Sequence, residues 1–209
     1  MDIPTFEEEA IKKSQGYKLI AGIDEAGRGP LAGPVVAAAI ILPPEVKGKW
    51  VAMVRDSKLV TAIRREKLYD QLRKTAISYG VGVVDSRTID MVGIAKATRL
   101  AMKSAVKQLE PTPDYLLIDY FQLPEVRIPQ KGVVEGDSLC FSIACASILA
   151  KVTRDRLMLE FEGAYPGYGF ADHKGYSTKE HLESLRRLGP SPIHRTSFQP
   201  VREAIGAGE

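Results

Sequence analysis

Two acidic side chains stand next to each other where an apolar run ends. Residues 19–23 are followed by Asp24 and Glu25, and then by the glycine-flanked arginine of Gly27, Arg28 and Gly29. Neighbouring carboxylates repel each other unless a cation or a shared proton neutralises them. Carboxylate oxygens are the ligands that Mg²⁺ and Mn²⁺ prefer in proteins. The pair therefore indicates a divalent-metal site, and the glycines leave backbone N–H groups open to a close approach by a ligand.

Two more aspartates follow apolar stretches in the same way. Asp119 ends the run YLLID, and Asp137 lies in VVEGDS, after a short expected edge strand. If the strand that ends at Asp119 neighbours the first strand, its carboxylate joins Asp24 and Glu25. Asp155 is eighteen positions beyond Asp137, which is about 27 Å of continuous helix, so we expect it to lie outside the metal site.

The composition is that of an ordinary globular protein. The chain has 209 residues, of which 44% are hydrophobic and 26% charged, with a formal charge of +3. This length suffices for one substantial core, and the mild positive charge is compatible with a polyanionic partner. No secretory signal and no membrane span are evident. Cys140 and Cys145 are placed on different faces of one expected helix, so we expect no disulfide, a reducing compartment and a cytoplasmic location.

The pattern of apolar residues predicts strands and helices in alternation. Thr5 and Glu8 form a capping-box pattern at the start of a short helix. Strands are expected at residues 17–24, 35–42, 79–84 and 114–119, with a short edge strand at 126–128 or 133–134. Helices are expected at residues 5–13, 62–77, 90–109, 142–161 and 178–188, and an aromatic, glycine-rich loop at 165–174. This order favours an α/β domain with a mixed sheet.

The sequence GIDEAGRGPLAGPVVAAA, residues 22–39, resembles the signature of the type 2 ribonuclease H family, the bacterial ribonuclease HII enzymes. Further resemblance covers most of the chain, including DSK, ASILAKVTRD, HKGYST and HRTSF. It implies the ribonuclease H-like fold, with a mixed five-stranded sheet flanked by helices and a helical C-terminal region. Residues 1–161 would form the catalytic domain and residues 162–209 the C-terminal region, packed together as one compact unit.

The resemblance also implies an activity and its site. Such an enzyme cuts the RNA strand of RNA–DNA hybrids, and DNA duplexes at single embedded ribonucleotides, using two Mg²⁺ or Mn²⁺ ions and leaving 5′-phosphate and 3′-hydroxyl ends. It would act as a monomer in ribonucleotide excision repair and DNA replication. The implied catalytic and metal-binding residues are Asp24, Glu25, Asp119 and Asp137. The implied substrate-binding residues are Gly27, Arg28, Gly29, Tyr176, Ser57, Lys58, Ser147 and Lys151.

Two alternatives use the same residues differently. A non-catalytic module could bind RNA–DNA hybrids with the same fold, although four carboxylates near phosphates weaken pure binding. A nucleotide-binding enzyme could use GRGPLAG as a phosphate loop, but this stretch lacks both the G-x-x-x-x-G-K-[ST] pattern and the G-x-G-x-x-G spacing. The chemistry of the residues therefore favours the metal-dependent nuclease. HRTSF, residues 194–198, is expected to have a structural role.

Overall fold

The structure, a computed structural model, describes residues 3–54 and 60–206 of the chain. Within these two ranges, no helix is both long enough and apolar enough to cross a membrane. Two residues of the implied substrate site, Ser57 and Lys58, lie outside the described residues.

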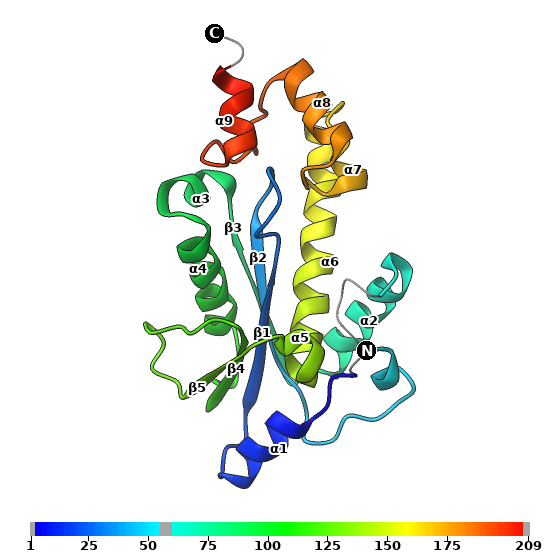
Figure 1. Cartoon of the computed structure of the whole chain (residues 1–209). Coiled ribbons are helices and arrows are strands. Elements are labelled where there is room, and N and C mark those ends of the chain that lie inside the picture. Colours follow the sequence, from blue (N-terminus) through cyan, green and yellow to red (C-terminus); the bar gives the residue numbers. More distant parts are fainter. Residues whose placement is uncertain (1–2, 55–59, 207–209) are drawn as a thin grey trace.

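A mixed five-stranded sheet forms the centre of the molecule (Figure 1). Its strand order is β3-β2-β1-β4-β5. β2 pairs antiparallel with both β1 and β3, whereas β4 pairs parallel with both β1 and β5. The strands are β1 (Ile20–Ala26), β2 (Val35–Ile41), β3 (Ser78–Val84), β4 (Tyr115–Asp119) and β5 (Gln130–Val133). The predicted α/β architecture with a mixed five-stranded sheet is therefore confirmed.

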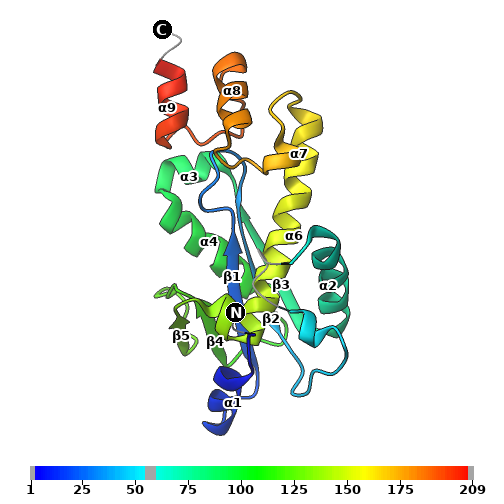
Figure 2. The same cartoon turned by 45° about the vertical axis from the view of Figure 1, so that its right-hand side comes forward.

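Helices cover both faces of this sheet (Figures 1 and 2). Successive side chains of β2 point to opposite faces, so that Ala37 and Ala39 pack in the core beside α4, whereas Ala38 and Ile40 pack in the core beside α2 and α6. The helices of the described chain are α1 (Glu7–Ser14), η1 (Val51–Met53), α2 (Ala62–Thr75), α3 (Ser86–Val92), α4 (Ile94–Lys107), α5 (Gly136–Leu139), α6 (Phe141–Ala164), α7 (Phe170–His173), α8 (Lys179–Leu188) and α9 (Gln199–Gly206).

The long helix α6 crosses the sheet close to β1. Gly22 makes this approach possible, because a Cβ atom there would collide with the backbone of Ser142. From this crossing, α6 continues along the molecule toward the C-terminal helices (Figure 1). One helix thus connects the end of β1 and β4 with the C-terminal region.

Several local expectations are wrong. The helix expected over residues 90–109 is two helices, because Gly93 adopts a φ of 79° between α3 and α4. The capping box is not formed: α1 has Phe6 at its N-cap and no side-chain cap, and the backbone of Thr5 instead pairs with Cys140. The edge strand occupies residues 130–133, which overlaps the expected position 133–134 only at Val133 and does not include residues 126–128.

The C-terminal segment packs against the loop between β1 and β2. The amide of Leu31 donates to the carbonyl of Gly175 at 2.8 Å, and the amide of Gly33 donates to the carbonyl of Ile193 at 2.9 Å. The segment contains two helices that sequence patterns did not predict, α7 within the expected loop 165–174 and α9 near the end.

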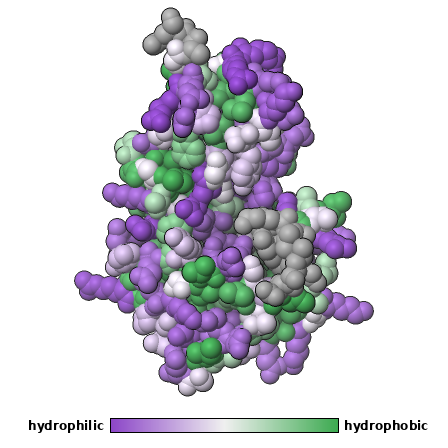
Figure 3. Space-filling model, viewed as in Figure 1, coloured by the Kyte–Doolittle hydropathy of each residue, from purple (hydrophilic) through white to green (hydrophobic). Residues whose placement is uncertain are grey.

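On the face in Figure 3, hydrophilic side chains predominate around α8, of which only His181 and Leu185 are buried. The expected boundary at residue 161 falls inside α6.

Candidate active site

The parallel pairing of β1 and β4 brings two aspartates together. Ile23 is aligned with Ile118, so that the next residues, Asp24 and Asp119, lie side by side at the carboxyl ends of their strands. The apolar residues before each aspartate are buried in the sheet, so both strands are held in the core. The sequence therefore places both carboxylates through the register of two buried strands.

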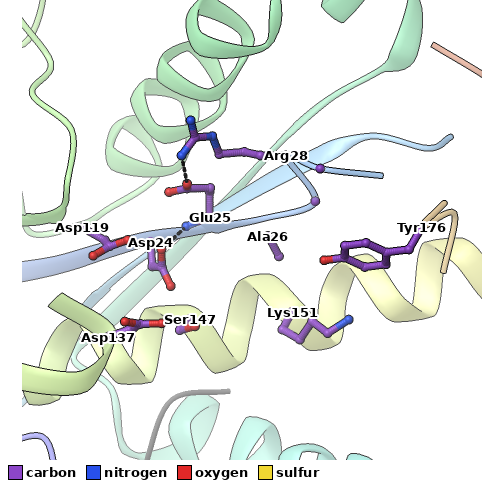
Figure 4. Close-up of a pocket in the computed structure, with 11 residues that line it drawn as sticks. Asp24, Glu25, Ala26, Arg28, Asp119, Asp137, Ser147, Lys151 and Tyr176 are labelled. Atoms are coloured by element: carbon purple, nitrogen blue, oxygen red, sulfur yellow. Dashed lines mark hydrogen bonds and ion pairs between the residues drawn. The ribbon is translucent and has the colours of Figure 1, made fainter. Parts of the chain in front are cut away.

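Asp24, Glu25 and Asp119 form a tight group, which we call the carboxylate cluster. One carboxylate oxygen from each residue lies within 4.8 Å of the others. Asp137, from α5, lines the same pocket but is not a member of this tight group (Figure 4). The amide of Gly136 donates to Asp119 Oδ1 at 2.8 Å, which ties α5 to the end of β4. Three of the four predicted catalytic carboxylates thus converge, and the fourth faces them across the pocket.

The carboxylate cluster is electrostatically unfavourable without a cation. Burial raises the pKa of Asp24 well above its ordinary value, and the neighbouring Glu25 and Asp119 raise it further. Burial also raises the pKa of Glu25 from 4.5 to about 7, an effect that the Arg28 guanidinium opposes and Asp119 increases. Arg28 Nη1 lies 3.3 Å from Glu25 Oε1. One arginine does not balance three carboxylates, so the cluster favours a bound divalent cation.

The donor set fits such an ion. The cluster offers only oxygen atoms, the ligand type that Mg²⁺ and Mn²⁺ prefer. Glu25 Oε2 is buried and has no hydrogen-bond partner in the described part of the chain. A buried polar atom without a partner is costly, and a divalent cation would satisfy it. Asp24, Glu25 and Asp119 are therefore the residues that would hold a metal, and Asp137 lines the same pocket.

Six of the eight predicted substrate-binding residues surround the same pocket. The cavity, of about 290 Å³, is lined by the four carboxylates and by Gly27, Arg28, Gly29, Ser147, Lys151 and Tyr176. We call residues 27–34 the reading loop. A Cβ atom on Gly29 would lie 3.9 Å from Tyr176 Cε1, so the loop and the ring border each other directly. Tyr176 is 43% exposed, which leaves its ring accessible from the pocket.

Ser147 and Lys151 lie one turn apart on α6 and face the pocket (Figure 4). The Ser147 hydroxyl hydrogen bonds to Asp24, which offsets part of the rise in the pKa of that carboxyl. Lys151 Nζ is 2.6 Å from Asp155 Oδ1, and Asp155 also lies 3.6 Å from Arg65. Asp155 therefore supports Lys151 and takes no part in the carboxylate cluster, as its position in the sequence predicted.

Two functional supports escaped the sequence analysis, the buried arginines Arg154 and Arg195. Arg195 donates to the carbonyls of Gly27, Arg28 and Gly33, and Arg154 donates to those of Ala32, Pro34 and Lys174. All but Lys174 belong to the reading loop. A lone arginine carries no sequence signal for such a role, although Arg195 lies in the HRTSF motif and Arg154 lies in the stretch ASILAKVTRD.

Buried histidines support the backbone of Tyr176. His181 Nδ1 donates to the Tyr176 carbonyl at 2.8 Å, and His181 Nε2 lies 3.0 Å from His194 Nε2. The amide of Ser191 donates to His194 Nδ1 at 2.9 Å. These partners assign the proton of His181 to Nδ1 and that of His194 to Nε2, with both rings neutral. Burial lowers the pKa of His194 to about 4, and it lowers that of His181 as well.

Comparison with known proteins identifies the family. The model of the ribonuclease HII family matches residues 21–201. The chain belongs to the ribonuclease HII family. A ribonuclease HII from Dehalococcoides mccartyi is 60% identical over 199 residues, covering 95% of this chain and 94% of the relative. One from Geobacter sulfurreducens is 53% identical over 201 residues, covering 96% and 90% of the two chains.

Solved structures show the same fold. The ribonuclease H2 from Pyrococcus horikoshii OT3 matches with a TM-score of 0.77 and 25% identity, over 91% of this chain and 98% of that chain. Bst-RNase HIII in complex with Mn²⁺ matches with a TM-score of 0.68 and 19% identity, over 91% and 70% of the two chains, which supports the fold alone. The protein is thus a ribonuclease H, a hydrolase with endonuclease activity, in a divalent-metal-dependent family that acts on RNA–DNA hybrids. The non-catalytic alternative is therefore wrong.

Proposed function

We propose that this ribonuclease incises DNA duplexes at single embedded ribonucleotides, in addition to cutting the RNA strand of hybrids, and leaves 5′-phosphate and 3′-hydroxyl ends. The observation that carries the proposal is one pocket that joins the carboxylate cluster to Gly27, Arg28, Gly29 and Tyr176. An enzyme that acts at one ribonucleotide must recognise its 2′-hydroxyl, the group that distinguishes RNA from DNA. Backbone amides of the reading loop and the Tyr176 ring are suited to that task.

The residues of the pocket have two kinds of proposed role, metal binding for the chemistry and contacts that recognise the substrate. Asp24, Glu25, Asp119 and Asp137 would hold Mg²⁺ or Mn²⁺, two ions in the substrate complex. When bound, these ions supply an activated water and stabilise the leaving 3′ oxygen. Tyr176 would stack on the deoxyribose next to the ribonucleotide, where a ribose hydroxyl would be rejected, and Lys151 would contact a phosphate. Ser147 and the Ser57–Lys58 pair are the further proposed contacts.

We place this activity in ribonucleotide excision repair and DNA replication, with the chain acting as a cytoplasmic monomer. The four predicted catalytic carboxylates and Tyr176 meet in one pocket of a single chain, so the proposed chemistry needs no residue from a second copy. The N-terminal 161 residues would provide the chemistry. Residues 162–209 would support recognition, because Tyr176 and Arg195 belong to them.

A cleavage assay tests the proposal. A labelled DNA duplex with one ribonucleotide is incubated with Mg²⁺ or Mn²⁺, beside an all-DNA duplex of the same sequence and a sample in excess EDTA. We expect one cut next to the ribonucleotide, no cut in the all-DNA duplex, and reversible loss of activity in EDTA. Equal cutting of both duplexes would refute recognition of the ribonucleotide, and activity that persists in EDTA would refute metal dependence.

A further inference from the structure

Two positive charges are buried behind the reading loop. Arg154 is 1% exposed and Arg195 is fully buried. Among the described residues, neither forms an ion pair with a carboxylate, and every hydrogen bond that either guanidinium makes goes to a backbone carbonyl. A buried charge without compensation is costly. Six carbonyl groups supply the compensation here, so the loop conformation and the two charges depend on each other.

Arg195 fixes the direction of the peptide groups that face the pocket. Its Nη2 donates to the Gly27 carbonyl at 2.6 Å, and its Nη1 donates to the Arg28 carbonyl at 2.9 Å. In a planar trans peptide, the N–H group points opposite to the C=O group. The amides of Arg28 and Gly29 therefore point away from Arg195, on the side of the pocket that these residues line. Within the described chain, neither amide donates a hydrogen bond.

Arg154 fixes the distance between the reading loop and Tyr176. Its Nε and Nη2 donate to the carbonyls of Pro34 and Ala32 at 2.9 and 3.0 Å, and its Nη1 donates to the Lys174 carbonyl at 2.9 Å. Lys174 is two residues before Tyr176. A Cβ atom on Gly27 would collide with the Arg154 side chain, so a glycine is required there by this guanidinium as well as by its φ of 94°.

We propose that Arg195 and Arg154 are positioning residues for recognition of the ribonucleotide. Arg195 turns the Arg28 and Gly29 amides toward the 2′-hydroxyl, and Arg154 holds that loop in register with the Tyr176 ring. Neither arginine touches the substrate. This inference rests on the proposed function, in which the reading loop and Tyr176 recognise the ribonucleotide.

Arg195→Lys tests the first role, because lysine keeps the charge but loses the planar fork that spans two carbonyls. The dissociation constant is measured in EDTA, where no strand is cut, for a single-ribonucleotide duplex and for the matching all-DNA duplex. The all-DNA constant divided by the single-ribonucleotide constant, which we call the binding ratio, reports the recognition of the 2′-hydroxyl. We expect this ratio to fall by about tenfold, the value of one hydrogen bond, while the affinity of the carboxylate cluster for Mn²⁺ stays unchanged.

Arg154→Lys tests the second role in a cleavage assay with Mg²⁺. We expect its rate to fall more on the single-ribonucleotide duplex than on a long RNA–DNA hybrid, by about tenfold. Equal losses on the two substrates would overturn the role of Arg154 in positioning Tyr176.

Leu72→Ala is the matched control for lost stability. Leu72 is buried in the core beside α2 and does not contact the reading loop. We expect it to lower the melting temperature and to leave the binding ratio unchanged. If Arg195→Lys also leaves the ratio unchanged, Arg195 is merely structural and the inference is wrong. If wild-type protein itself shows a ratio of one, the proposed function fails instead.

A milder variant decides the matter if Arg195→Lys does not fold. Asp90 accepts hydrogen bonds from the amides of Thr196 at 2.8 Å and Ser197 at 2.9 Å, directly after Arg195. Asp90→Asn weakens this anchor without removing a buried charge. We expect the binding ratio to fall about two- to threefold, and an unchanged ratio would overturn the inference.

Discussion

The carboxylate cluster and the reading loop share one pocket but are stabilised in opposite ways. In the cluster, burial and mutual repulsion raise the pKa values of Asp24 and Glu25, and Glu25 Oε2 has no partner among the described residues. In the loop, the buried charges of Arg154 and Arg195 are satisfied by backbone carbonyls. The cluster thus needs a bound cation to balance its charges, whereas the buried charges behind the loop are balanced by carbonyl groups of the chain itself.

This contrast implies that chemistry and recognition can be disturbed separately. The cluster lies at the ends of β1 and β4 and depends on the register of the sheet. The reading loop depends on residues from α6 and from the C-terminal segment, more than 100 positions away in the sequence. Changes to the first should abolish cleavage with little effect on recognition, and changes to the second should reduce discrimination while cleavage of hybrids continues.

The largest effect is expected for Asp119→Asn. The variant keeps the shape of the side chain and removes a charge that would hold the metal, so that cleavage should fall by about a thousandfold or more. The measurement is the initial rate on a long hybrid with Mg²⁺, together with the melting temperature to show that the fold is intact. A rate within about tenfold of wild type would show that Asp119 is not a metal ligand.

The stability of the metal-free protein should depend on Glu25. A pKa raised from 4.5 to about 7 means that the unfolded state loses its proton first as the pH rises. As the pH rises from about 4.5 to 7, the contribution of Glu25 therefore lowers the free energy of unfolding by about 3 kcal/mol. In EDTA at pH 8, Glu25→Gln should be more stable than wild type by about that amount, and near pH 4 the two should be equal.

Denaturation in urea at the two pH values measures this difference. Glu125→Gln is the matched control, because Glu125 is exposed and the ion pair with Lys103 lowers its pKa. This control should show no gain at pH 8. If Glu25→Gln gives no gain either, Glu25 is not strained in the metal-free state.

A smaller and selective loss is expected for Tyr176→Ala. Stacking of an aromatic ring contributes about 1–3 kcal/mol per nucleotide, so the rate on a single-ribonucleotide duplex should fall about ten- to a hundredfold. The loss on a long hybrid should be smaller, and Tyr176→Phe should retain most of the activity. Equal losses on both substrates would assign Tyr176 a structural role and leave recognition to Gly27, Arg28 and Gly29.

The smallest effect is expected for Asp155→Asn. Without the ion pair at 2.6 Å, Lys151 loses its fixed position beside the pocket. KM should rise about threefold on every substrate, with kcat nearly unchanged, because ion pairs of partly exposed residues contribute about 1 kcal/mol. Glu183→Gln removes the exposed pair with Lys179 and should change neither constant. A fall in kcat by orders of magnitude would instead make Asp155 part of the catalytic site.

The sequence was sufficient to predict the carboxylates that stand directly at the end of an apolar strand. Asp24 and Asp119 each follow an apolar strand, and two parallel strands with these ends bring the carboxylates together. The break at Gly93 was missed because the apolar stripe continues through both helices. The break itself lies in the φ of 79° at Gly93, and the spacing of apolar residues carries no information about that angle. The edge strand was misplaced because residues 130–133, QKGV, lack an apolar alternation.

The supports of the reading loop could not be predicted in the same way. Arg195 and His194 lie in HRTSF, but their partners are backbone carbonyls and another histidine that are distant in sequence. A carbonyl group is present at every residue, so the sequence does not show which ones an arginine will bind. Such contacts follow only from the packing of the C-terminal segment on the loop between β1 and β2.

One measurement tests the separation of chemistry and recognition most directly. The affinity of Asp119→Asn is determined in EDTA for a single-ribonucleotide duplex and for the matching all-DNA duplex, beside wild-type protein. We expect the all-DNA constant divided by the single-ribonucleotide constant to stay within about threefold of wild type, although the variant no longer cleaves. A ratio that falls to one in Asp119→Asn would show instead that recognition depends on the carboxylate cluster itself.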